Sequence, residues 1–68
     1  MSAWGDMDDE DLVETFRMAR NLMESLRSES YRRMQERDTL SIKGEGATII
    51  QHRATETEPE NYIYVKVN

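Results

Sequence analysis

The segment FRMARNLMESLR, residues 16–27, decides the fold that this sequence predicts. Its apolar side chains recur at the spacing of one helical face: Phe16, Ala19, Met23 and Leu26. The chain has no Gly or Pro between Gly5 and Gly44, so neither of the two strong helix breakers interrupts this pattern. Extended in both directions, the pattern predicts one long N-terminal helix over residues 8–37.

Residues near the two ends of this stretch favour the same helix. Asp8 is a candidate N-cap, and Met7 and Leu12 have the spacing of a hydrophobic staple around it. Acidic residues crowd the first turn, and arginines in the last turns also complement the helix dipole: Arg32, Arg33 and Arg37. Two serines, which are poor helix formers, mark residues 28–30 as the place where the helix would break.

The second half of the chain has the alternation and the turn residues of β-strands. GEG at 44–46 predicts a hairpin turn, and ETEPEN at 56–61 predicts a polar loop. These turns separate three expected strands: TLSIK at 39–43, ATIIQHRAT at 47–55 and YIYVKVN at 62–68. We therefore predict an α+β fold. Residues 1–7 form an N-terminal tail, and residues 8–68 form a single domain in which the helix precedes a three-stranded antiparallel β-meander.

The predicted helix and strands differ in length. A helix of 30 residues (8–37) is about 45 Å long, whereas strands of six to eight residues are about 20 to 27 Å long. Either the helix breaks near residues 28–30 and folds back, or its uncovered part packs on another chain. The apolar arc favours the second alternative, because it spans about 180° with Val13 and Tyr31 included and one contact surface needs only about 100°. We therefore expect a homo-oligomer; the alternative is one well-buried core helix.

Arg20 and Arg27 border this apolar arc, beside aromatic and methionine side chains. Such a composition is typical of protein interfaces. We expect one group of residues to contact another copy or another protein: Phe16, Ala19, Arg20, Met23, Leu26, Arg27, Tyr31 and Met34. A plainer interpretation is that the arginine stems only cover the helix edge. The expected outer face of the sheet, with Tyr62, Tyr64 and Lys66, is a second candidate surface.

The same arginines suggest a second class of function, the binding of an anionic small molecule such as a nucleotide. Guanidinium groups bind phosphate, and an aromatic side chain can stack on a base. The candidate contacts, in arginine-lined pockets between subunits, are Trp4, Arg17, Arg20, Arg27 and Tyr31. A third hypothesis is a nucleic-acid mimic that presents the carboxylates of residues 6–14 and 56–60 to a basic groove. The net charge of −5 argues against direct binding to nucleic acid or to an anionic membrane.

The sequence contains no group that indicates an enzyme, a cofactor or a metal ion. His52 is the only histidine, and no orienting partner for base catalysis is recognisable. The chain has no Cys, which excludes disulfides and makes a zinc site improbable. DMDDED lacks the ligand spacing of an EF-hand, and GEG lacks the Lys-Ser/Thr of a phosphate loop. We therefore predict a non-enzymatic protein, without cofactors, that acts by protein binding as an inhibitor, adaptor or assembly factor.

Two further features bear on location. No apolar run approaches the roughly 20 residues of a membrane span, and the acidic N-terminus lacks the apolar region of a signal peptide. We therefore expect a cytoplasmic protein. Small, acidic chains without cysteine are also common among phage-encoded proteins that modulate their host, and for such a protein the expected location is the host cytoplasm.

Overall fold

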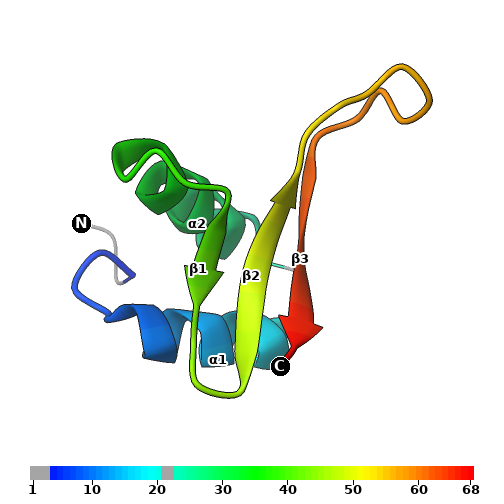
Figure 1. Cartoon of the computed structure of the whole chain (residues 1–68). Coiled ribbons are helices and arrows are strands. Elements are labelled where there is room, and N and C mark those ends of the chain that lie inside the picture. The colour runs from blue at the N-terminus through cyan, green and yellow to red at the C-terminus, as the bar shows by residue number, and fades with distance from the viewer. Residues whose placement is uncertain (1–3, 21–22) are drawn as a thin grey trace.

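The computed structural model describes residues 4–20 and 23–68 (Figure 1). Five elements follow one another along the chain: α1 (Asp9–Ala19), α2 (Glu24–Glu36), β1 (Ser41–Lys43), β2 (Ala47–His52) and β3 (Tyr62–Val67). The strands form one antiparallel sheet in the order β1-β2-β3. The predicted α+β class and β-meander are therefore confirmed. Residues 1–3 of the predicted N-terminal tail lie outside the described residues.

The prediction of one long helix is wrong, because the structure has two shorter helices. Helix α1 ends where Arg20 adopts the left-handed conformation, with φ 54°, and its N–H donates to the Arg17 carbonyl at 3.2 Å. Residues 28–30, where we expected a break, lie inside α2 instead. Ser30 is fully buried there and donates to the Leu26 carbonyl at 3.0 Å. This bond satisfies its hydroxyl group without interrupting the helix.

The break at the end of α1 removes the mismatch in length between helix and sheet. With 11 and 13 residues, the two helices are about 17 and 20 Å long, close to the length of a strand. Both lie on the same face of the sheet (Figure 1). One core joins helices and strands: Leu12, Val13, Phe16, Leu26, Met34, Ile42, Ala47, Ile49 and Ile63. The length argument therefore no longer requires a second chain.

The N-terminus of α1 has the predicted cap, whereas that of α2 has none. The Asp8 side chain accepts a hydrogen bond from the Asp11 N–H at 2.8 Å. Met23 precedes α2 and makes no side-chain cap bond. Neither of these helices is long and apolar enough to cross a membrane.

The strand register decides which side chains face the helices. Ile49 lies opposite Ile42 on one side and Val65 on the other, and these residues share the inner face. Successive strand residues alternate between faces. Tyr64, which lies opposite Ile50, is therefore on the outer face.

Residues 53–61 join β2 to β3 and extend beyond the helices (Figure 1). All of them are exposed. The Thr55 N–H donates to the Glu58 carbonyl at 2.7 Å, and the Ala54 N–H donates to Asn61 Oδ1 at 2.7 Å. These bonds close the segment into a defined turn. We call it the acidic arm, after its carboxylates Glu56, Glu58 and Glu60.

Candidate functional site

The predicted interface residues divide into a buried group and a surface group. Phe16, Leu26 and Met34 are at most 1 % exposed, so this chain covers them itself. Ala19 and Tyr31 are partly buried against the same core. The remaining members reach the surface: Arg20, Met23 and Arg27. A partner can contact this second group without opening the core.

The predicted ligand contacts lie in separate parts of the single chain. Trp4 is partly buried, and its Nε1 donates to Ser25 Oγ at 3.1 Å. Tyr31 lines a hollow between α2 and β2, whereas Arg17 and Arg20 line another between α1 and β3. Arg27 lines neither of these two hollows.

A buried charged group that the sequence analysis missed lies in the last turn of α2. The guanidinium group of Arg33 is 5 % exposed, and it binds Glu29 Oε2 at 2.7 Å and Asp9 Oδ1 at 2.9 Å. It also donates to the carbonyl oxygens of Trp4, at 2.8 Å, and Met7. Arg33 therefore holds α2, the start of α1 and the segment before α1 together.

Two further arginines complete this network. Arg32 donates to both carboxylate oxygens of Glu29, and its hydrogen bonds hold the pKa of Glu29 below its usual value. Arg37 bonds to both oxygens of Asp9 and is the main cause of the lowered pKa of that carboxyl group. The ionised carboxylates are favoured because hydrogen bonds to the charged form outweigh desolvation. The arginines that we assigned to the helix dipole, Arg32, Arg33 and Arg37, thus each pair with a carboxylate of this chain.

The first candidate site is the hollow between α1 and β3, which we call the α1–β3 groove. Its volume is about 290 Å³ and its lining is Phe16, Arg17, Arg20, Tyr64, Val65 and Val67. Within the described part of the chain, neither arginine has an ion-pair partner. Apolar surface is exposed in the same lining, where Val67 is 61 % exposed. Unpaired guanidinium groups thus lie beside uncovered apolar surface.

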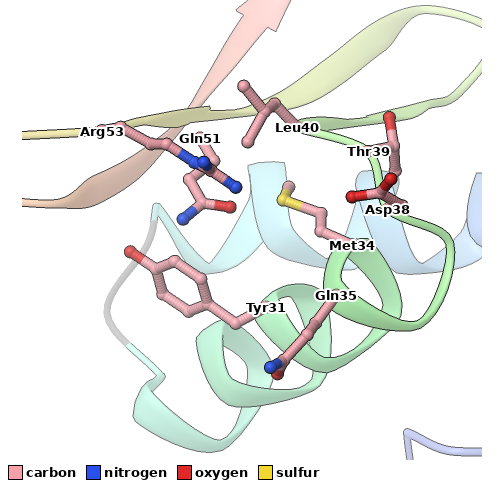
Figure 2. A pocket seen from close by; sticks show the side chains of 8 residues that line it. All are labelled: Tyr31, Met34, Gln35, Asp38, Thr39, Leu40, Gln51 and Arg53. Carbon is pink, nitrogen blue, oxygen red and sulfur yellow. The ribbon is translucent and has the colours of Figure 1, made fainter.

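The second candidate site is the hollow between α2 and β2, the α2–β2 groove (Figure 2). Its volume is about 700 Å³ and its lining is Tyr31, Met34, Gln35, Asp38, Thr39, Leu40, Gln51 and Arg53. Figure 2 shows Arg53 and Gln51 at the end toward which the Tyr31 hydroxyl points, Met34 in the middle, and Asp38 with Thr39 at the other end. These residues come from two segments, 31–40 and 51–53, that only the fold brings together, so most of them could not be predicted as one site from the sequence.

The outer sheet face carries a row of aromatic rings. His52 and Tyr62 are stacked with centroids 4.6 Å apart, and Tyr64 follows at 6.0 Å from Tyr62. His52 Nε2 lies 3.4 Å from Glu58 Oε2 of the acidic arm. Desolvation raises the pKa of the Tyr62 hydroxyl. Tyr62 also lines a shallow hollow of about 290 Å³ against the acidic arm, together with Thr57, Glu58, Pro59 and Glu60.

Comparison with known proteins assigns no function to either groove, so both are interpreted from their own geometry. The chain matches no family model, no curated protein and no solved structure. Among residues 4–20 and 23–68, no group of three or more His, Cys, Asp or Glu side chains could hold a metal ion.

Proposed function

We propose that the chain is a small non-enzymatic interaction protein that forms homo-oligomers and acts by binding other proteins, as an inhibitor, adaptor or assembly factor. The observation that carries this proposal is the α1–β3 groove. There Arg17 and Arg20 lack carboxylate partners among the described residues and line the hollow together with the exposed side chain of Val67.

Arg17 and Arg20 differ in their ion pairing from three arginines at the end of α2. In α2, Arg32, Arg33 and Arg37, the last at its C-cap, are all bound to carboxylates of this chain. Arginine beside aromatic and apolar side chains is enriched in interfaces, because its planar group pairs with carboxylates and its stem covers apolar surface. The α1–β3 groove therefore offers a partner two cations and an apolar floor.

The occupant that we propose for this groove is the acidic arm of a second copy. The arm carries three exposed carboxylates, Glu56, Glu58 and Glu60, which complement the two free arginines. The arm precedes β3, whereas the groove lies beside the C-terminal half of that strand. Two copies arranged antiparallel along β3 would place each arm at the groove of the other, and such a reciprocal contact closes as a two-fold dimer.

The size of the chain also favours association. A domain of 68 residues buries a small share of its surface, and it has no disulfide to stabilise it. Covering Val67 in a dimer adds apolar burial at about 25 cal/mol per Å².

The test is light scattering of the purified protein over a range of concentrations, combined with charge reversal. Arg20→Glu and the double variant Glu56→Lys/Glu60→Lys should each shift the protein toward the monomer. An equimolar mixture of the two variants should restore the dimer, because the reversed charges again complement each other. Glu14→Lys, on the exposed face of α1, changes charge without touching the arm and should leave the dimer intact.

A protein that stays monomeric at every concentration would refute the homo-oligomer. If the protein remains a dimer in both Arg20→Glu and Glu56→Lys/Glu60→Lys, the arm-and-groove contact is refuted, although the protein still forms an oligomer. Circular dichroism of each variant confirms that the fold is unchanged, so that loss of the dimer is not loss of structure.

A further inference from the structure

We propose that the α2–β2 groove binds a small aromatic anion, in which a flat ring with N–H donors carries a carboxylate or phosphate either directly or through a sugar. The groove is formed by one chain, so this inference does not depend on oligomerisation. Its volume of about 700 Å³ lies in the range of small-molecule sites.

One end of the groove gathers hydrogen-bond donors. Arg53 has no ion-pair partner among the residues described, unlike the arginines of the buried network. The Gln51 side chain lies below it, and the Tyr31 hydroxyl points toward both (Figure 2). A guanidinium, an amide NH₂ and a phenol can all donate to one anion. This end of the groove is therefore suited to a carboxylate or phosphate group.

The middle of the groove is apolar. Leu40, which is 42 % exposed, is the open apolar wall, and Met34, only 1 % exposed, lies beneath it with its sulfur atom toward the hollow (Figure 2). The Tyr31 ring forms a third wall on the α2 side. Thioether sulfur and aromatic rings pack well against a flat ring. A bare inorganic anion would leave these apolar walls uncovered.

The opposite end of the groove accepts hydrogen bonds. Asp38 and Thr39 lie together there (Figure 2). Asp38 has the left-handed backbone conformation, with φ 50°, which sets it in the turn between α2 and β1. Its carboxylate would repel a second anionic group but would accept from ring N–H or exocyclic amino groups. The charge order along the groove, positive to apolar to negative, thus selects one ligand polarity.

The experiment is a titration of the isotope-labelled chain, followed by amide chemical shifts. The probes are adenosine monophosphate and 4-aminobenzoate, which are the phosphate and carboxylate forms of the ligand class. Adenosine, which lacks the anion, and inorganic phosphate, which lacks the ring, are the two comparison compounds. Saturable shifts confined to residues 31–40 and 51–53 are expected with at least one aromatic anion, and the tighter of the two identifies the anionic group.

Two variants link any binding to the groove. Arg53→Ala should weaken the aromatic anion about tenfold or more, the effect of losing a charge-assisted contact. Arg20→Ala removes an equally unpaired arginine from the other groove and should leave affinity unchanged. The amide spectrum of each variant shows whether the fold is retained.

Three results would overturn the proposal. They are the absence of saturable shifts with both aromatic anions up to roughly 10 mM, phosphate alone binding as tightly as the aromatic anions, and equal losses in Arg53→Ala and Arg20→Ala. The last two results would mean that exposed arginines attract anions by their charge alone, without a specific site.

Discussion

Replacing Arg33 by Ala should cost the fold about 3 kcal/mol of unfolding free energy. Arg33 is 5 % exposed and bonds to two carboxylates and two backbone carbonyls. Removing one partner of a buried ion pair costs about 3–5 kcal/mol, because the other charge stays buried without compensation. The lower value applies here, since Glu29 keeps its two bonds to Arg32.

That loss is large for a chain of this size. At 0.05–0.15 kcal/mol per residue, 68 residues give a total stability of roughly 3–10 kcal/mol. Arg33→Ala should therefore be close to unfolded, or unfold at much lower denaturant concentration than the parent. Arg37→Ala is the matched control. It also loses bonds to Asp9, but its side chain is half-exposed, so we expect a loss of about 1 kcal/mol or less.

Urea unfolding followed by two probes measures these differences. The single tryptophan, Trp4, reports on the segment that Arg33 holds, and far-ultraviolet circular dichroism reports on both helices. Adding Glu29→Leu to an Arg33→Met variant should recover part of the stability, since no buried charge is then left unpaired. The reasoning fails if Arg33→Ala loses no more stability than Arg37→Ala.

The same network predicts how stability depends on acid. The pKa of Asp9 is lowered mainly by Arg37, and that of Glu29 mainly by Arg32. Depressed carboxyl pKa values contribute stability that is complete above the unfolded pKa of about 4. That stability disappears as the pH falls through the folded values. Urea midpoints measured from pH 7 to pH 2 should therefore fall below about pH 4, and fall less steeply in Arg37→Ala.

Two further predictions concern the turn before β2 and its neighbours. A hydrogen bond to Glu45 raises the pKa of Glu10, so this contact contributes stability at low pH that is lost as the pH rises through the folded pKa. Glu45→Gln should therefore raise the melting temperature at pH 7 and give little change at low pH; a lower melting temperature at pH 7 would contradict the pairing. Gly44→Ala should cost about 1–3 kcal/mol, because the new Cβ would lie 3.0 Å from Val13 side-chain atoms, whereas Gly46→Ala meets no atom within 4 Å. Urea midpoints compare the two variants, and equal midpoints would contradict this steric argument.

The sequence predicted the sheet well because its signals are local. Alternating β-branched residues and the Gly-Glu-Gly turn at 44–46 depend on neighbours in the chain. The start of α1 was predictable for the same reason, since an Asp8 cap acts only on the following turn. The end of α1 was not predictable, because Arg20 takes the left-handed conformation that sequence rules assign to glycine.

The polar part of the buried face of α2 was missed, whereas its apolar members Leu26 and Met34 were predicted. Its covered residues follow one helical stripe: Leu26, Glu29, Ser30, Arg33 and Met34. A hydrophobicity pattern discards the three polar members, although Glu29 and Arg33 have the spacing of an ion pair on one face. This pair of opposite charges four residues apart lies on the stripe that carries Leu26 and Met34, and from it the buried ion pair could have been predicted.

The break at Arg20 changes what the arginines of this acidic chain can do. In one continuous helix, Arg17, Arg20 and the arginines of α2 would follow each other along one axis, and Arg33 and Arg37 would lie too far from Asp9 to bind it. With the chain folded back, α2 comes against the start of α1, where Asp9 binds Arg33 and Arg37. Arg17 and Arg20 stay at the far end of α1, beside β3 and away from those carboxylates. The break after α1 therefore separates arginines that stabilise the fold from Arg17 and Arg20, which have no carboxylate partner among the described residues. Charge reversal at Arg20 should therefore shift the protein toward the monomer while each chain keeps its fold.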